Sequence, residues 1–561
     1  MKTVICQINS KYIHSSLAAW CLLAGVREYS IGDVDAAVLE GTINEKSEVT
    51  LARILDASPD AIGFCTYIWN FSRVLKLAKQ VKAKLPNAYI ILGGPEVSYS
   101  SRELLETYPF IDFILSGEGE QSFAALADAL ALGSGFESVG GLSYRSVEGI
   151  VSNLPSAPLK LPPSPYLPEY FDTLCGRIAY IETSRGCPFS CAFCLSGTCG
   201  GGGLRFFPLE RSKSEILKLA ASGTRTIKFV DRTFNADRKR ALELFQFIID
   251  NYGGAIPEGV TFHFEIAARL LDFETLEVIS RFPSGAAQFE VGIQSFNEKT
   301  LEAIGRREKL DLLEANTVRL ISLGNVSVHT DLIAGLPFED YTSFGRGFDR
   351  AFGMKPRMLQ LGFLKVLHGS AMGEDGYLYP CEHDSTAPYE VSSTKWLSHE
   401  ELLTLKRIED IHERLYNSAR FLRTLDFLIK ASRRTPFEVY EKLADEMQYD
   451  MRISLDDFTR VLYDAVRTVE GVDEAELKEV LMLDRMESNS EGRLPELLRF
   501  DLTKAKRILL KRRPELFAGG VRRSIGWSAL RGCAVFADYS MSPDPITDRY
   551  TAEFVYEDQK Q

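Results

Sequence analysis

The sequence of 561 residues predicts an α/β protein with two successive series of parallel strands and helices, followed by a mainly helical region. Three observations carry this prediction. Strand and helix patterns alternate along two stretches of the chain, a Pro-rich stretch separates them, and helical periodicity dominates after Trp396. Alternating strands and helices are typical of a parallel sheet covered by helices. A chain of this length is also expected to form two to four domains.

The first series spans residues 1–135 and predicts five strand–helix units. The expected strands are 4–8, 35–39, 61–65, 89–92 and 113–115. The expected helices between and after them are 16–29, 49–57, 72–84, 101–107 and 121–132. Five such units indicate a doubly wound, Rossmann-like sheet, and sheets of this kind bind ligands at the carboxyl ends of their strands.

A linker is expected over 136–174, because 154–168 contains six prolines and reads as an extended connector. The second series then covers 175–370. Its expected strands are 178–183, 226–230, 261–266, 288–291, 327–333 and 359–364. Six strand–helix units predict a partial parallel (β/α)6 barrel, whose chemistry is expected at the ends of its strands.

The region 371–561 is expected to be mainly helical, with helices at 400–419, 421–432, 436–447, 455–469 and 473–486 and a mixed, strand-like end. We expect no membrane span, because the chain contains no apolar run of about 18 residues. The N-terminus lacks the pattern of a secretory signal, so we expect a cytoplasmic protein. The net charge of −12 makes nucleic acid an unexpected partner, and the basic groups at 511–513 and 522–523 are interpreted as solvated surface.

Four of the ten cysteines lie within thirteen residues: Cys187, Cys191, Cys194 and Cys199. This pattern in a long chain indicates metal in a reducing compartment rather than a disulfide framework. The first three follow a predicted strand with the spacing Cys-x3-Cys-x2-Cys. Three thiolates so spaced can hold three irons of a 4Fe–4S cluster and leave the fourth iron open to a chelating molecule. The alternative is a set of buried or zinc-binding cysteines, with Cys199 as the fourth zinc ligand.

The segment 182–194 resembles the signature of the radical S-adenosylmethionine (SAM) superfamily, and the resemblance spans roughly residues 175–370. It implies that Cys187, Cys191 and Cys194 hold the cluster and that the open iron binds the amino and carboxylate groups of SAM. It also implies that an electron from an external donor, such as flavodoxin or ferredoxin, releases a 5′-deoxyadenosyl radical.

Further segments at successive strand ends carry the same resemblance: 231–235, 265–269, 292–295 and 331–337. Subgroup members usually have Glu where Gln294 stands. Arg269 would pair with the methionine carboxylate of SAM, and the alternative for it is a surface arginine at a helix start. The resemblance implies SAM contacts from Phe193, Asp231, Asn235, Glu265, Arg269, Gln294, Ser295, Asp331 and Gly335.

A doubly wound domain before such a barrel resembles the cobalamin-binding radical SAM class. Three loops at strand ends would contact cobalamin through Tyr67, Trp69, Asn70, Gly93, Gly94, Pro95, Glu96, Ser98, Gly117, Glu118, Gly119 and Glu120. Many cobalamin proteins ligate cobalt with the His of an Asp-x-His-x-x-Gly motif. His14 lacks the Asp and the Gly, so we interpret it as an ordinary loop histidine. The alternative is a sheet that has lost cobalamin.

The tail from about residue 380 resembles a helical domain of uncharacterised function found in one branch of these proteins, through 388–391, 395–397 and 416–418. The combined resemblance implies a cobalamin-dependent radical SAM enzyme, most often a methyltransferase. It would abstract hydrogen from an unreactive carbon of a small molecule or peptide, and methylcobalamin would deliver the methyl group. The alternatives are cyclisation, rearrangement or oxidation, a non-enzymatic cobalamin or iron–sulfur protein, and tRNA modification, which the acidic charge disfavours.

Overall fold

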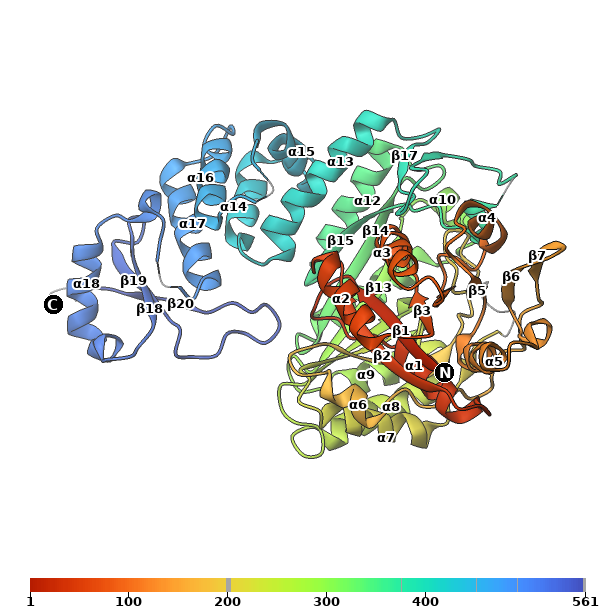
Figure 1. The fold of residues 1–561 in the computed structure, drawn as a ribbon. Helices are drawn as coiled ribbons and strands as arrows, with labels where there is room; N and C mark the ends of the chain where they lie inside the picture. The colour runs from red at the N-terminus through yellow and green to blue at the C-terminus, as the bar shows by residue number, and fades with distance from the viewer. Residues whose placement is uncertain (198–202, 375, 451, 492, 558–561) are drawn as a thin grey trace. The chain divides into compact units, whose positions relative to one another are not determined.

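The computed structural model describes residues 1–197, 203–374, 376–450, 452–491 and 493–557 (Figure 1). Contacts divide the chain into two compact units. Unit 1 comprises Met1–Glu290, Glu302–Lys309 and Leu364–Ser392, and unit 2 comprises Val291–Leu301, Leu310–Phe363 and Ser393–Gln561. Unit 1 therefore contains both the predicted Rossmann-like sheet and the cysteine-bearing start of the predicted barrel.

The first sheet of unit 1 has the order β2-β1-β3-β4-β5-β6-β7. Its five parallel strands confirm the predicted doubly wound sheet: β1 (Lys2–Asn9), β2 (Asp35–Thr42), β3 (Ala61–Cys65), β4 (Tyr89–Gly93) and β5 (Phe113–Leu115). An antiparallel hairpin, β6 (Leu142–Ser146) and β7 (Gly149–Ser152), extends the sheet beyond β5. The irregular linker expected over 136–174 is therefore confined mainly to 153–167, before the short helix α6 (Pro168–Asp172).

Helices cover both faces of this sheet. On one face, α2 (Ser47–Ala57), α3 (Phe71–Lys84) and α4 (Ser101–Thr107) share a core with alternate side chains of β1, from Val4 to Ile8. On the other face, α1 (Ala18–Tyr29) packs against α5 (Gly119–Leu132). A Cβ atom added at Gly25 of α1 would lie 2.2 Å from the carbonyl oxygen of Glu120. This close approach fixes the first turn of α5 against α1.

The second sheet contains the six predicted barrel strands in the order β8-β11-β12-β13-β14-β15, with α7 to α12 along the chain between them. The strands are β8 (Ala179–Ile181), β11 (Thr226–Phe229), β12 (Thr261–Ile266), β13 (Ala287–Gln294), β14 (Ser327–Ala334) and β15 (Met358–Phe363). The helices are α7 (Leu209–Ala220), α8 (Arg238–Asn251), α9 (Phe273–Ile279), α10 (Glu298–Ala303), α11 (Leu310–Ser322) and α12 (Tyr341–Gly353). Strand β13 crosses the boundary between the two units.

The C-terminal part of unit 2 is helical, as predicted, with α13 (His399–His412), α14 (Leu422–Ser432), α15 (Pro436–Glu446), α16 (Leu455–Val466) and α17 (Glu474–Ser488). Capping boxes at Ser398 and Thr435 begin α13 and α15. The mixed end consists of α18 (Leu502–Arg512) and an antiparallel sheet of β18 (Arg523–Ser528), β19 (Cys533–Asp538) and β20 (Ala552–Val555), drawn in blue in Figure 1. Among the residues described, no helix is both long and apolar enough to cross a membrane.

Candidate functional site

The three cysteines lie on a hairpin that follows β8. Two short antiparallel strands form its base, β9 (Ser184–Arg185) and β10 (Arg205–Phe206), with Arg185 opposite Arg205. We call the described residues 184–197 and 203–206 the cluster hairpin. Gly186 has φ +91°, and a Cβ atom there would lie 2.4 Å from the carbonyl oxygen of Gly203. Glycine is therefore required where the two arms meet, directly before Cys187. Cys199 falls outside the described residues.

The environment of the three thiols suits thiolate ligands. Cys191 is buried, whereas Cys187 and Cys194 are partly exposed. The backbone N–H of Ser196 donates to the sulfur of Cys194 at 3.4 Å, and the Thr233 hydroxyl lies 3.6 Å from the sulfur of Cys187. Burial raises the pKa of Cys191, the positive charge of Arg306 opposes that rise, and the neighbouring charges of Cys194 and Cys187 add to it. Arg306 therefore favours the thiolate form of Cys191, against the effect of burial.

A cubane cluster binds each of its cysteines through a different iron, so its ligands need not converge on one point. In the described part of the chain, no three Cys, His, Asp or Glu side chains converge to hold a single metal ion. The spacing of the thiols on the hairpin and the N–H group aimed at sulfur fit the three-thiolate cluster expected from the sequence.

Charged side chains with unsatisfied atoms surround the hairpin. The guanidinium of Arg269 lies 4.9 Å from the ring centre of Phe189, which is itself between Cys187 and Cys191. Its Nε is 3.6 Å from Glu308, a carboxylate that also lies 3.5 Å from Arg306. Arg269 Nε and Glu308 Oε2 are buried and find no hydrogen-bond partner among the described residues. Arg269 is thus placed against the cysteine loop with a side chain that is 30% exposed, and its contact with SAM stays a prediction.

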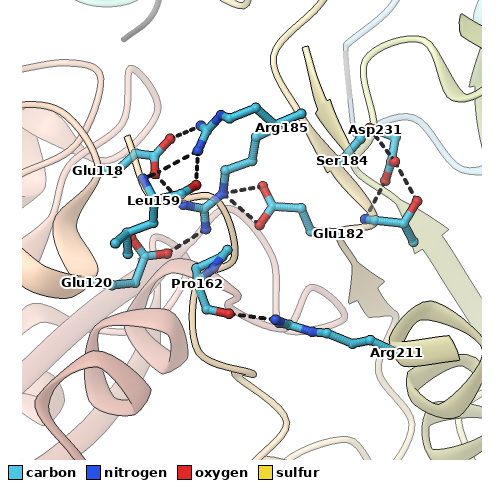
Figure 2. A network of polar contacts seen from close by, with 11 residues as sticks. Glu118, Glu120, Leu159, Pro162, Glu182, Ser184, Arg185, Arg211 and Asp231 are labelled. Carbon is cyan, nitrogen blue, oxygen red and sulfur yellow. Dashed lines mark hydrogen bonds and ion pairs between the residues drawn. The ribbon is translucent and has the colours of Figure 1, made fainter. Parts of the chain in front are cut away.

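Two predicted SAM contacts hold backbone segments in place. The carboxylate of Asp231 is buried and accepts hydrogen bonds from the backbone N–H and hydroxyl of Thr183, at 2.9 and 2.7 Å, and from the Ser184 hydroxyl at 2.6 Å (Figure 2). Asn235 exchanges two hydrogen bonds with the backbone of Ala267, at 3.0 and 2.9 Å. Asp231 therefore positions the start of the cluster hairpin, and Asn235 positions the turn that carries Arg269.

Glu265 belongs to a set of charged side chains on neighbouring strands of unit 1. It lies 3.9 Å from Lys228 and 3.8 Å from Arg232. Burial raises its pKa, and the charge of Arg232 opposes that rise. Glu290 accepts from Lys228 at 3.3 Å and lies 2.8 Å from His263, which holds its pKa low, at about 2, against the effect of burial. Phe193 is partly exposed on the cysteine loop.

The remaining predicted SAM contacts belong to unit 2. Gln294 ends β13 with φ +71°, a strained conformation for a non-glycine residue that is often found at functional sites. Ser295 is buried and accepts from the backbone of Asn297 at 2.9 Å. Asp331 is half-buried on β14, and Gly335 follows that strand with φ +93°. Burial raises the pKa of Glu339, which bonds to Ser295, to about 7.

The first predicted cobalamin loop, after β3, presents an aromatic pair. Tyr67 and Trp69 stack with ring centres 4.4 Å apart, and Trp69 is 46% exposed. Asn70 is fully buried, and its amide donates to the carbonyl oxygens of Ile8 and Cys65 at 2.9 and 3.0 Å. Asn70 therefore joins the ends of β1 and β3, and the aromatic pair is the part of this loop that faces outward.

The second loop, after β4, passes close to its neighbour. A Cβ atom at Gly94, which has φ +119°, would lie 2.4 Å from the carbonyl oxygen of Thr66. After Pro95, the buried Glu96 accepts a hydrogen bond of 2.5 Å from the hydroxyl of Tyr389. The Ser98 hydroxyl donates to the carbonyl of Gly94 at 2.8 Å. Gly94 thus lets this loop pass close to Thr66, whereas the carboxylate of Glu96 bonds to a residue far along the chain.

The third loop, after β5, is bonded to the cluster hairpin. Gly117 has φ +91° and Gly119 begins α5. The carboxylates of Glu118 and Glu120, predicted to contact cobalamin, pair with Arg185 at 3.1 and 2.5 Å, and Glu118 also pairs with Arg205 (Figure 2). Sequence reasoning did not find these arginines, or Thr233 and Tyr389, because their partners are distant in sequence.

His14 is hydrogen-bonded within the protein. Its Nδ1 lies 2.6 Å from the hydroxyl of Tyr180 on β8, and its backbone bridges to Ile178. Burial lowers its pKa. These contacts agree with the interpretation of His14 as an ordinary loop histidine.

Comparison with known proteins gives matches to three family models. Residues 4–127 match the B12 binding domain, 181–347 match the radical SAM superfamily, and 377–513 match a protein family of unknown function, DUF4080. The first two matches coincide with the doubly wound sheet and with the cysteine-bearing barrel strands, as predicted.

Relatives agree with these matches. A cobalamin-dependent radical SAM methyltransferase, TokK of Streptomyces tokunonensis, is 32% identical over 309 residues, covering 52% of this chain and 44% of that protein. An anaerobic magnesium-protoporphyrin IX monomethyl ester cyclase of Synechocystis is 26% identical over 261 residues, covering 45% of this chain and 51% of the cyclase. The chain thus spans about half the length of these relatives.

The fold is also that of solved proteins. The cobalamin-dependent SAM radical enzyme OxsB, solved with aqua-cobalamin and SAM, superposes with a TM-score of 0.57 at 14% identity, covering 86% of this chain and 78% of OxsB. Together with the family matches, this likeness places cobalamin, a 4Fe–4S cluster and SAM as the cofactors of these domains. The chain therefore contains a B12 binding domain, a radical SAM domain and a DUF4080 domain, and it is similar to cobalamin-dependent radical SAM methyltransferases.

Proposed function

We propose that this protein is a cobalamin-dependent radical SAM methyltransferase that methylates an unactivated carbon of a small molecule or peptide. The observation that carries the proposal is the three-cysteine hairpin, which lies in one compact unit with the B12-binding sheet and is bonded to its β5–α5 loop. A methyl donor bound to the sheet and a radical source bound to the hairpin would then both lie in unit 1.

When bound, the cluster and SAM supply a 5′-deoxyadenosyl radical, and cobalamin supplies the methyl group. Cys187, Cys191 and Cys194 would each hold one iron. Arg269 would bind the methionine carboxylate with its fork of donors. The further proposed SAM contacts are Gln294, Ser295, Asp331 and Gly335, together with Glu265 and with Phe193, which would lie beside the adenine.

The proposed cobalamin contacts lie in the loops after β3, β4 and β5. They are the side chains or backbone of Tyr67, Trp69, Gly93, Gly94, Pro95, Ser98, Gly117 and Gly119. Asn70 and Glu96 would support these loops from behind. Cobalt would have no protein ligand from His14, because His14 lacks the Asp and the Gly of the Asp-x-His-x-x-Gly motif. The reducing electron would come from flavodoxin or ferredoxin in the cytoplasm.

A second candidate is a radical reaction without methyl transfer, such as cyclisation or oxidation. The cyclase relative favours it. The charged set of Lys228, His263, Glu265 and Glu290 inside unit 1 would suit either reaction, because confined charges orient a polar substrate while apolar walls exclude water.

The experiment is anaerobic purification with cobalamin available, followed by measurement of iron, sulfide and corrin absorbance. Wild-type protein should carry all three. The Cys187→Ala, Cys191→Ala, Cys194→Ala triple variant should lose iron and keep the corrin band. Cys175→Ala, at an exposed free cysteine, is the matched control and should lose neither. Cys199→Ala should also keep the cluster. Iron retained in the triple variant, or lost in Cys199→Ala, would overturn the three-thiolate site.

A further inference from the structure

Two arginines at the base of the cluster hairpin reach the same carboxylate. Arg185 precedes the first cysteine by two residues and Arg205 stands opposite it on β10. Glu118 forms an ion pair with Arg185 at 3.1 Å and accepts hydrogen bonds from Arg205, so one side chain of the β5–α5 loop contacts both arms (Figure 2). A carboxylate bound to both arms holds them in register at the point where the cysteine loop begins and ends.

Neighbouring groups complete this contact. Arg185 also bonds to Glu120 at 2.5 Å and to Glu182 at 2.9 Å. The irregular segment 153–167 also contacts this group of side chains. The backbone N–H of Leu159 donates to Glu118 at 3.2 Å, and the Leu159 carbonyl accepts from Arg205. The side chains of Arg185 and Glu120 are only 14% and 4% exposed. Partly buried charges bonded in this way are costly to separate, because each would be left without a partner.

The β5–α5 loop is itself held firmly, so it can act as a fixed support. Glu120 packs against Gly25 of α1, as described above, and a Cβ atom at Gly119 would lie 2.6 Å from the side chain of Leu22. A Cβ atom at Gly141 would lie 2.2 Å from the carbonyl oxygen of Ser116, just before the loop. The loop therefore cannot shift without moving α1 or the β6 end of the sheet.

We infer that Glu118 and Glu120 are positioning residues of the cluster hairpin rather than cobalamin contacts, and that they couple the B12-binding sheet to the hairpin. A ligand that binds the β5–α5 loop more tightly when the hairpin is bonded to it then stabilises the hairpin, and the bonded hairpin favours that ligand in return, because coupling between two sites is reciprocal. The part of this inference that concerns cobalamin rests on the proposed function. The positioning of the hairpin does not.

The test is hydrogen exchange, followed by mass spectrometry, on protein without cofactors. Glu118→Gln should exchange about tenfold or more faster in the two arms of the hairpin, the effect of losing hydrogen bonds between charged groups. Arg205→Gln removes the other partner, and the double variant should exchange no faster than the faster single variant. Glu169→Gln breaks the exposed pair with Arg27 and should leave the hairpin unchanged. Circular dichroism checks that each variant is folded.

The second arm adds hydroxocobalamin to the same proteins. In the wild type it should slow exchange in the hairpin, whereas in Glu118→Gln it should bind with similar affinity and leave hairpin exchange fast. If the hairpin of Glu118→Gln exchanges at the wild-type rate, the positioning role of Glu118 is wrong. If that variant no longer binds cobalamin, Glu118 is a cobalamin contact. A wild type that binds no cobalamin would contradict the proposed function, while the first arm would still decide the role of Glu118.

Discussion

The hydroxyl oxygen of Thr233 lies 3.6 Å from the sulfur of Cys187. Thr233 is buried in the loop after β11, and its hydroxyl is also 2.8 Å from the carbonyl oxygen of Arg232. Its single proton can serve only one of these acceptors. When Cys187 is deprotonated by iron, the thiolate becomes the stronger acceptor, and the hydroxyl is expected to donate to it.

Thr233→Val should therefore lower the midpoint potential of the cluster. Hydrogen bonds to cluster sulfurs stabilise the reduced, more negative state and raise the potential. A net loss of about 0.5–1 kcal/mol corresponds to a decrease of roughly 20–40 mV for one electron. Potentiometric titration followed by electron paramagnetic resonance measures this shift. Thr233→Ser keeps the hydroxyl and should stay near the wild-type value, and an unchanged potential in Thr233→Val would exclude the hydrogen bond.

Arg269→Ala should weaken SAM binding by about 1.5–3 kcal/mol, or roughly 10–150-fold, because a charged hydrogen-bond donor to the methionine carboxylate is lost. Arg269→Lys should recover only part of the affinity, since a lysine cannot form the fork. Titration of SAM against the resonance signal of the reduced cluster measures both. Arg238→Ala, which removes an exposed arginine paired with Asp272 and Glu274, is the control. Equal affinities in Arg269→Ala and wild type would remove Arg269 from the SAM site.

His14→Ala should retain cobalamin, because His14 lacks the Asp and the Gly of the cobalt-binding motif. The variant loses the 2.6 Å hydrogen bond between His14 Nδ1 and the hydroxyl of Tyr180. Tyr180→Phe breaks the same hydrogen bond from the other side and should cause a similar, small loss of stability, about 1 kcal/mol. The corrin absorbance of the purified variants is the measurement. Loss of cobalamin in His14→Ala but not in Tyr180→Phe would instead identify His14 as a cobalt ligand.

His412 makes the stability of unit 2 sensitive to acid. Its Nε2 lies 3.0 Å from the carbonyl oxygen of Leu359, and burial lowers its pKa to about 3. An unfolded histidine has a pKa of about 6.5. Between these values the unfolded chain binds a proton that the folded chain does not, so stability falls as pH falls below about 6.5, by up to about 1.4 kcal/mol per pH unit.

His412→Gln should remove this dependence, because glutamine can keep an N–H donor toward Leu359 but does not titrate. The variant is expected to be less stable at pH 7, and the comparison is between slopes. Urea unfolding at pH 6.5 and 5.0 should show a wild-type loss about 2 kcal/mol larger than that of the variant. Parallel slopes would mean that His412 is protonated in the folded protein.

Two strands occupy their predicted ranges for different reasons. Strand β3 (61–65) is buried throughout and reads as a continuous apolar run, whereas β12 (261–266) is indicated by Phe262, Phe264 and Ile266, buried side chains that alternate along the strand. The β6–β7 hairpin was missed because Leu142–Ser146 is mostly polar. It is held by pairing with β5 and by Arg145, which donates to the carbonyl oxygen of Ile111 at 2.5 Å. Such contacts exist only in the folded chain.

The candidate site likewise has features that the sequence predicts and contacts that only the folded structure shows. The spacing of Cys187, Cys191 and Cys194 on a loop after a strand follows directly from the sequence. The partners of Asp231 and Glu118 do not, because a polar residue at a strand end can face a ligand or satisfy a neighbouring segment. Asp231 bonds to Thr183 and Glu118 to Arg205, 48 and 87 residues away. Only the three-dimensional arrangement distinguishes the two uses.

The most direct test of the proposed function is product analysis after anaerobic incubation of the reconstituted protein with SAM and dithionite. The account predicts both 5′-deoxyadenosine and S-adenosylhomocysteine, and neither product from the triple cysteine variant. 5′-Deoxyadenosine without S-adenosylhomocysteine would support the radical reaction without methyl transfer. Protein that carries a full complement of iron and cobalamin but forms no 5′-deoxyadenosine would contradict the central claim.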